Sequence, residues 1–244
     1  MELREFRAEL PSTQTEATRR AREGAPVGTR IVAARQTAGH GRGSHHWASP
    51  PGNVYLSLVV RGPSLHRSML PLAVGARLRR ALFERYGIQT ALKWPNDLLV
   101  PGPGGPRKLL GILVDVVPSP TLGSVAVVGI GVNVRASLES YPPDLRGRVA
   151  ELAEWTQGAP DLAEVEELVV SAVHSAIDAL ATAGGAAEVL EECRSALHGV
   201  GRQATVDQEI TGVIRGVGEE GELLLDTPSG AVVVRAGNLV VEES

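Results

Sequence analysis

Residues 37–47 read TAGHGRGSHHW, in which three closely spaced glycines are followed by two histidines and a tryptophan. Apolar segments that are typical of β-strands flank this stretch, RIVAAR at 30–35 and NVYLSLVV at 53–60. A tight turn between two strands needs about two to five residues, so this connection is longer than a simple hairpin requires. Glycine allows the backbone to approach a ligand closely, and Arg42 adds positive charge. Two interpretations stay open here: a loop that wraps an anionic ligand, and an ordinary surface loop.

Composition and charge exclude several classes of protein. The 244 residues carry a net charge of −4 and 43% hydrophobic residues, which fits a globular protein without an overall basic field for nucleic acid. The single cysteine, Cys193, excludes an internal disulfide and favours a reducing environment. The N-terminus lacks the apolar segment of a signal peptide, and no run approaches the roughly 18 apolar residues of a membrane span. We therefore expect a cytoplasmic protein without a membrane partner.

Hydrophobic periodicity predicts the main elements of the first two-thirds of the chain. Ser12 is a good N-cap for a short helix that ends near Gly24. A four-residue apolar repeat predicts a helix over 64–86, with Arg77 among the arginines on its outer face. Besides the two strands that flank the glycine-rich stretch, long apolar strands are expected at 109–117 and 125–134.

The last third of the chain changes character twice. Residues 139–192 are acidic and are expected to be mostly helical, with a packing helix that begins near Asp161. From about Gly199 onward, short apolar runs alternate with glycine-containing turns, which suggests a small appended barrel. The strands expected there are 203–206, 209–217, 222–226, 231–235 and 239–242.

A second polar insert lies within residues 90–100, TALKWPNDLLV. Pro95 removes a backbone donor and favours an extended conformation for the residue before it, so two apolar strands bracket a rigid kink. The kink presents Lys93, Asn96 and Asp97. Only two of the 24 basic residues are lysines, Lys93 and Lys108, and such sites can require a compact point charge rather than a planar guanidinium. A plain surface ion pair is the alternative reading of this insert.

Together these features favour a site that holds two anions side by side. Gly111, Gly129 and Gly131 lie inside strands, where glycine often marks the close approach of a ligand. Cations beside such strands suit the joining of a carboxylate to a nucleotide phosphate, because both reactants are negative and repel each other.

The motifs that carry this chemistry resemble those of biotin protein ligases. GHGRGSHHW is similar to their GRGRxGRxW loop, KWPNDLLV to their KWPND signature, RKLLGILVDV and VGIGVNV to their KxxGIL and GxGxN segments, and PSTQTEA to their D-S-T-N element. The resemblance covers almost the whole chain, with the motifs in the same order. The form of the family that the chain resembles is the short one, without an N-terminal DNA-binding domain. It implies an α+β fold: a mixed sheet flanked by helices, akin to class II aminoacyl-tRNA synthetases, with a small C-terminal SH3-like β-barrel. The implied domains are a catalytic domain at 1–197 and the barrel at 198–244.

The resemblance also implies a two-step reaction. The biotin carboxylate attacks the α-phosphate of ATP, with Mg²⁺ assisting, to give biotinyl-5′-AMP and pyrophosphate. A lysine of the biotin carboxyl carrier protein or domain of a biotin-dependent carboxylase then attacks the mixed anhydride. The implied partner is this carrier, with no DNA partner, and the implied assembly is a monomer or weak homodimer.

Matching positions assign the site residues. Lys93 and Arg42 are the implied catalytic residues, and no residue is assigned firmly to a metal. The implied biotin-binding residues are Ser12, Thr13, Gln14, Gln36, Gly39, His40, Gly41, Arg42, Lys93, Gly111, Gly129 and Gly131. The implied nucleotide-binding residues are Arg42, Trp47 (over the adenine), Lys93, Asn96, Asp97 and Asn133, with Lys108 as a weaker assignment.

The sequence departs from the family pattern at His40, Ser44 and His45, where the family has Arg, Gly and Arg, and at Gln14, where it has Asn. Histidine is mostly neutral at pH 7, so the loop is expected to hold an adenylate less firmly. It is also expected to be mobile without ligand and to order on adenylate binding. The alternatives are a lipoate or octanoate ligase on the same fold, a non-catalytic biotinyl-AMP sensor, and a nucleic-acid-binding module.

Overall fold

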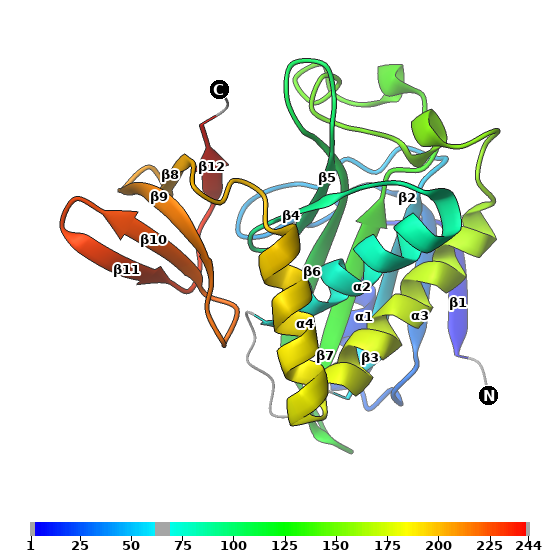
Figure 1. The fold of residues 1–244 in the computed structure, drawn as a ribbon. Coiled ribbons are helices and arrows are strands. Elements are labelled where there is room, and N and C mark those ends of the chain that lie inside the picture. Colours follow the sequence, from blue (N-terminus) through cyan, green and yellow to red (C-terminus); the bar gives the residue numbers. More distant parts are fainter. Residues whose placement is uncertain (1–2, 62–68, 243–244) are drawn as a thin grey trace.

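A seven-stranded sheet forms the centre of the computed structural model, which describes residues 3–61 and 69–242 (Figure 1). The strand order is β1-β2-β3-β7-β6-β5-β4. β1 pairs with β2 in parallel and every other pair is antiparallel, so the expected mixed sheet is confirmed. The strands are β1 (Arg4–Leu10), β2 (Arg30–Gln36), β3 (Val54–Val60), β4 (Ala91–Lys93), β5 (Asp97–Val100), β6 (Arg107–Ser119) and β7 (Gly123–Val132).

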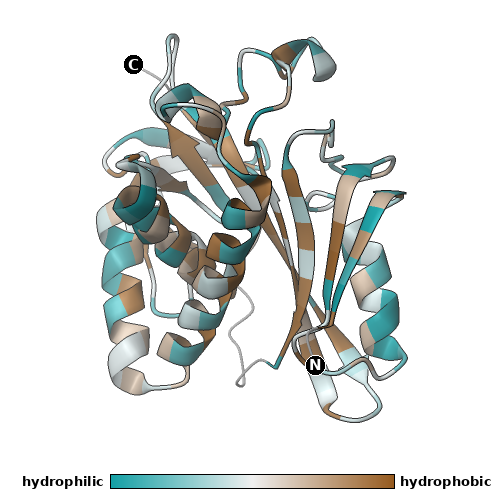
Figure 2. Cartoon of the chain, turned by 90° about the vertical axis from the view of Figure 1, so that its right-hand side faces the viewer, coloured by the Kyte–Doolittle hydropathy of each residue, from teal (hydrophilic) through white to brown (hydrophobic). Residues whose placement is uncertain are grey.

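Helices cover both faces of this sheet. α2 (Met69–Tyr86), α3 (Leu162–Leu180) and α4 (Ala183–Ala196) enclose the main core on one face, whereas α1 (Thr13–Arg22) packs on the other face over a smaller core. Figure 2 shows apolar strands between helices whose outward residues are mostly hydrophilic. No helix within residues 3–61 and 69–242 is long and apolar enough to cross a membrane.

The helix predictions hold in part. α1 begins after the N-cap Ser12, whose Oγ accepts from the Thr15 amide at 3.4 Å. α2 matches the end of the helix expected at 64–86, although residues 64–68 lie outside the described residues. Arg77 is not on an outer face: its side chain is 8% exposed and pairs with two glutamates of α4, because α4 packs against that side of α2.

Residues 139–192 contain less helix than the sequence predicts, because the helix begins only after Asp161. α3 does begin after its N-cap Asp161, as the sequence predicts. The residues before it contain only two short 3₁₀ helices, Leu138–Ser140 and Leu152–Trp155, joined by turns. Pro142 and Pro143 lie in this stretch, and proline interrupts a helix because it lacks the backbone donor.

The strand β1 has no counterpart among the predictions. Its sequence REFRAEL carries four charged side chains and little alternating apolar pattern. It lies at the edge of the sheet beside β2, where most of its residues are exposed and charges are tolerated. An edge strand of this kind gives no hydrophobic signal.

The C-terminal residues form a second sheet with the order β11-β10-β9-β8-β12. The expected strands are confirmed, but a closed SH3-like barrel is not, since no pairing joins β11 to β12 within residues 3–61 and 69–242. β12 has only three residues, and all three pair with β8. The strands are β8 (Gln203–Val206), β9 (Ile210–Val217), β10 (Leu223–Thr227), β11 (Gly230–Val234) and β12 (Leu239–Val241).

The two sheets are joined by direct contacts. Trp94, which is 1% exposed, donates from Nε1 to the Gly221 carbonyl at 3.0 Å, and Arg194 of α4 donates to the Val217 carbonyl at 3.0 Å. Apolar residues of the second sheet also belong to the main core cluster. The tryptophan of the 90–100 insert thus fastens the second sheet to the first.

Candidate functional site

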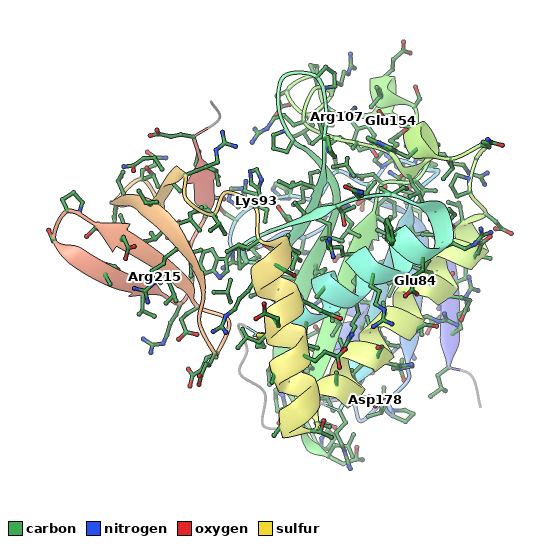
Figure 3. All side chains as sticks on the ribbon, in the orientation of Figure 1. Glu84, Lys93, Arg107, Glu154, Asp178 and Arg215 are labelled. Carbon is green, nitrogen blue, oxygen red and sulfur yellow. The ribbon has the colours of Figure 1, made fainter. Side chains whose placement is uncertain are left out.

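Four predicted site residues lie in one row across neighbouring strands. Lys93 pairs with Asp97, Asp97 with Gly111, and Gly111 with Gly131. Residues directly opposite in an antiparallel sheet project to the same face, so this row belongs to one surface. Alternate positions further along β6 and β7 pack against α1, which identifies the surface as the α1 face. Lys93 is at the end of β4, in the hairpin that precedes β5 (Figure 3).

Trp47 lies directly on the glycines of this row. A Cβ atom at Gly131 would stand 2.5 Å from Trp47 Cε2, and one at Gly111 would stand 2.8 Å from Trp47 Cζ3. The two glycines are therefore required for the indole to touch the strands. The indole Nε1 is buried and has no hydrogen-bond partner among the described residues, although a buried donor normally has one.

Lys108 connects Trp47 with the row of site residues. Its Nζ lies 4.8 Å from the centre of the indole ring and 2.8 Å from Asp97 Oδ1. Asp97, Lys108 and Trp47 thus form a stack in which a cation lies between a carboxylate and an aromatic face.

A series of hydrogen-bonded polar side chains, here called the polar chain, begins at Gln14. It runs beside the row of site residues described above, here called the glycine row. Gln14 Nε2 donates to Asp115 Oδ2 at 2.8 Å and to the Val127 carbonyl at 3.1 Å, so both amide protons are used. Ser57 Oγ lies 3.0 Å from Gln14 Oε1 and 3.0 Å from Thr13 Oγ1, and its one proton serves either acceptor. A Cβ at Gly129 would stand only 2.4 Å from Gln14 Oε1, so Gly129 provides the room for this amide.

The polar chain continues into the glycine-rich loop. Gln36 Oε1 accepts from the Thr13 amide at 2.8 Å, and Gln36 Nε2 donates to Ser49 Oγ at 2.8 Å. Ser49 Oγ in turn donates to the Trp47 carbonyl at 3.0 Å. Gly39 fits closely against this end, since a Cβ there would lie 2.5 Å from the Trp47 carbonyl oxygen. The first turn of α1 and the loop thus share one hydrogen-bonded network.

The loop itself forms a short hairpin. The Trp47 amide donates to the Gly39 carbonyl at 2.9 Å, and the Gly41 amide donates to the His45 carbonyl at 2.8 Å. These bonds flank a bridge between His40 and His46, both of which are exposed. The structure gives the hairpin a defined geometry, and its mobility stays a prediction.

Arg42, at the turn of the hairpin, reaches the second sheet. Its Nη1 donates to the carbonyl of Gly237, between β11 and β12, at 3.0 Å. Burial lowers the pKa of Arg42, and Asp97 and Asp207 oppose this effect. A guanidinium stays charged in proteins, so Arg42 brings a partly buried positive charge between the row and the second sheet.

Two predicted nucleotide residues use their amides inside the protein. Asn96 Nδ2 donates to the Ile112 carbonyl at 2.7 Å. Asn133 is 2% exposed, donates to the Lys108 carbonyl at 3.1 Å and accepts from Tyr141 at 3.2 Å. Both asparagines thus hold strands and loops in position; Asn133 is buried, whereas Asn96 is half-buried.

Sequence reasoning missed three members of the polar chain: Ser49, Ser57 and Asp115. Ser57 stands alone among apolar residues in VYLSLVV, and Asp115 is the one charge in LLGILVDVV. A lone polar residue in a buried strand must find a partner, and that signal was available in the sequence.

No metal cluster accompanies this site: residues 3–61 and 69–242 contain no group of three or more His, Cys, Asp or Glu that could hold a metal ion. A cavity of about 370 Å³ lies on the other side of the sheet, at α2, and contains none of the site residues. Its lining residues include Arg79, Phe83 and Ile88.

The arrangement suits an extended ligand with a polar ring at one end and an acidic group at the other. The polar chain offers fixed donors and acceptors next to Gly129. Lys93, Lys108 and Arg42 place three cations toward the other end, where negative charge is stabilised.

Known proteins share both the sequence and the fold of this chain. The model of the biotin/lipoate A/B protein ligase family matches residues 7–133. The bifunctional ligase/repressor BirA of Bacillus subtilis is 33% identical over 227 residues, covering 91% of this chain and 68% of that protein. The biotin–[acetyl-CoA-carboxylase] ligase of Paracoccus denitrificans is 30% identical over 242 residues, covering 95% of this chain and 98% of that protein. The biotin protein ligase from Aquifex aeolicus, solved in complex with biotin and ATP, has a TM-score of 0.84 at 27% identity over the whole of both chains.

Proposed function

The chain belongs to the biotin/lipoate A/B protein ligase family, and on that premise we propose that it is a biotin protein ligase. It activates biotin with ATP and transfers it to a lysine of a biotin carboxyl carrier protein, as the name of the acetyl-CoA-carboxylase ligase relative implies. The observation that supports biotin as the substrate is the polar chain from Asp115 to Ser49 beside the glycine row.

The reaction has two balanced steps. A biotin carboxylate oxygen attacks the α-phosphorus of ATP, the bond to the β-phosphate oxygen breaks, and pyrophosphate leaves. The ε-amine of the carrier lysine then attacks the carbonyl of biotinyl-5′-AMP, loses a proton and forms an amide, while AMP leaves. The first step brings two anions together, so neutralising charge and fixing geometry are the protein's main contributions.

The polar chain supports recognition of the biotin ureido ring, which presents one carbonyl acceptor and two N–H donors. Gln14 is fixed on both sides, by Asp115 and by Ser57, so its orientation does not have to be selected on binding. Thr13 and Gln36 bring a hydroxyl and an amide to the same place. A lipoyl dithiolane ring has no carbonyl or N–H with which to hydrogen-bond these groups, which disfavours the lipoate alternative.

Cations support the acidic end of the ligand. We assign Lys93 to the space between the biotin carboxylate and the α-phosphate, because it lies at the end of the glycine row and in register with Asp97. Arg42 and Lys108 add charge from the loop and from β6. Gly39, His40 and Gly41 contribute the loop backbone, and Trp47, whose buried N–H lacks a partner among the described residues, covers the ligand.

Mg²⁺ would arrive with ATP. It prefers oxygen ligands, keeps several waters and usually takes one or two protein carboxylates together with substrate phosphates. Asp97 is a carboxylate of the α1 face at the phosphate end of the row that fits such a donor set, and the ion would supply further neutralisation of phosphate charge. Within the family pattern, Asn96 and Asn133 then support this region through their structural hydrogen bonds.

The division of the chain follows the two sheets: we propose a catalytic domain at 1–197 and an accessory domain at 198–244. The accessory domain contributes the Gly237 carbonyl to Arg42 and the Gly221 carbonyl to Trp94. A monomer or weak homodimer remains our expectation for the assembly.

A transfer assay tests this function. The purified chain, a biotin carboxyl carrier domain, ATP and Mg²⁺ are incubated with biotin or with lipoate, and the carrier mass is measured. We expect the carrier to gain one biotinyl group, and a carrier with its acceptor lysine replaced by arginine to gain none. Modification by lipoate in preference to biotin would overturn the substrate assignment, and no modification by either would overturn the ligase.

A further inference from the structure

The glycine-rich hairpin carries a pair of histidines whose side chains have no role in the proposed ligase reaction. His40 and His46 form an isolated antiparallel bridge. The hydrogen bonds on either side of it, from the Trp47 amide to Gly39 and from the Gly41 amide to His45, make this a non-hydrogen-bonded pair. In such a pair the Cα atoms lie about 4.5 Å apart and the side chains stand closest together.

The pair faces away from the ligand site. Trp47 packs onto Gly111 and Gly131 of the sheet. Neighbouring side chains of an extended strand point to opposite faces, so His46, next to Trp47, lies on the outward face, and its cross-strand partner His40 shares that face. Both side chains are exposed and therefore accessible to an ion from solvent. His45 belongs to the other side of the hairpin.

We propose that His40 and His46 form a binding site for a transition-metal ion such as Zn²⁺ or Ni²⁺, which clips the two arms of the hairpin together. Two imidazole nitrogens that share one ion lie about 3 Å apart, since each Zn–N bond is about 2.0–2.1 Å. Cβ atoms about 5 Å apart allow two rings to reach that separation. Water completes the coordination, because no third His, Cys, Asp or Glu within the described residues joins the pair.

Neutral imidazole is the form that binds metal. Imidazole suits Zn²⁺, Ni²⁺ and Cu²⁺, whereas Mg²⁺ demands oxygen ligands. Mg²⁺ supplied with ATP therefore does not compete for the pair, and the clip is separable from the metal requirement of the reaction.

The clip acts on the proposed reaction through the hairpin. A metal-bound pair adds a cross-link that persists only while Gly39 and Trp47 stay paired, so it opposes any opening of the loop that ligand exchange requires. At a metal concentration about 100 times the dissociation constant, the clipped form is favoured about 100-fold over a form that cannot bind. This consequence rests on the proposed ligase function, whereas metal binding does not.

Titration calorimetry of the tag-free full chain with Zn²⁺ and with Ni²⁺ tests the site. We expect one ion per chain, binding at least about tenfold weaker in His40→Ala and in His46→Ala because the chelate is lost, and unchanged binding in the matched control His45→Ala. Mg²⁺ should give no heat at the same concentration. Absence of Zn²⁺ and Ni²⁺ binding, or equal losses in all three variants, would overturn the site.

Turnover then tests the clip. In the transfer assay with saturating Mg²⁺ and ATP, Zn²⁺ should slow wild-type turnover about fivefold or more, as expected when loop opening limits the rate. A chelator that prefers Zn²⁺ to Mg²⁺ should restore it, and His46→Ala should resist. Equal inhibition of wild type and His46→Ala would refute the clip while leaving the binding result and the ligase assignment intact.

Discussion

Replacing Gly131 by alanine tests whether the glycine row is the floor of the site. The new Cβ would stand 2.5 Å from two atoms of the Trp47 indole, whereas carbon atoms in contact lie about 3.5–4.0 Å apart, so the ring must retreat by about 1 Å. Overpacking of this kind costs about 1–3 kcal/mol, and each kcal/mol lowers Tm by about 2–4 °C in a chain of this size. A displacement of about 1 Å at the reacting groups costs on the order of 100-fold in rate, so adenylate formation should fall by about 10–100-fold.

Thermal unfolding and biotin-dependent ATP–pyrophosphate exchange measure the two effects. The matched control is Gly147→Ala, because a Cβ at Gly147 meets nothing within 4 Å and the residue lies outside the site. We expect the control to match the wild type in both assays. A Gly131→Ala protein with the Tm and exchange rate of the wild type would show that Trp47 does not pack on this floor in solution.

Four further predictions concern single groups. Lys93→Ala should lower the rate of adenylate formation at least about 100-fold. Its stability should change by about 1 kcal/mol or less, because a half-buried lysine packs little, and turnover near wild type would remove Lys93 from catalysis. Asp115→Ala frees a proton of Gln14 Nε2, so the KM for biotin should rise about tenfold while kcat stays within about threefold; an unchanged KM would exclude this positioning role. Burial, with Glu154 nearby, raises the pKa of Glu151 from 4.5 to about 7, so the folded state holds its proton more tightly than the unfolded chain. The stability that the protonated form confers is then lost as pH rises from about 4.5 to 7. In denaturant titrations, the free energy of unfolding of Glu151→Gln should rise by up to about 3 kcal/mol relative to wild type between pH 5 and pH 8. Parallel pH profiles of the two proteins would contradict the pKa shift. Amide hydrogen exchange across residues 39–47 should be fast alone and slow with biotin and ATP, and equal protection in both states would refute the mobile loop.

The central sheet was predictable because its strands carry uninterrupted apolar runs. β3 is wholly buried, β7 is buried from Val125 to Ile130 and β6 from Leu109 to Ile112, and burial on both faces leaves a strong signal in the sequence. β1 escaped because its charged residues lie at an exposed edge. Closure of the C-terminal sheet could not be judged from strand lengths alone, because closure depends on which strands pair.

The site was predictable as a set of motifs but not as a network. The glycines and Lys93 belong to strand pairs whose register brings separate motifs into one row, and register depends on the pairing of distant segments. The contact of Arg42 with Gly237 joins residues 195 positions apart and has no local signature. The structure sets Trp47 against Gly111 and Gly131, because two glycines in adjacent strands leave a flat surface for an indole, and its contact with an adenine stays a prediction.

The most direct test of the central claim is detection of the activated intermediate. The purified chain is incubated with biotin, ATP and Mg²⁺ in the absence of a carrier, and the products are resolved by mass spectrometry. The account predicts biotinyl-5′-AMP and pyrophosphate, with the adenylate absent when lipoate replaces biotin. A reaction that yields no biotinyl-5′-AMP, or yields lipoyl-AMP in its place, would contradict it.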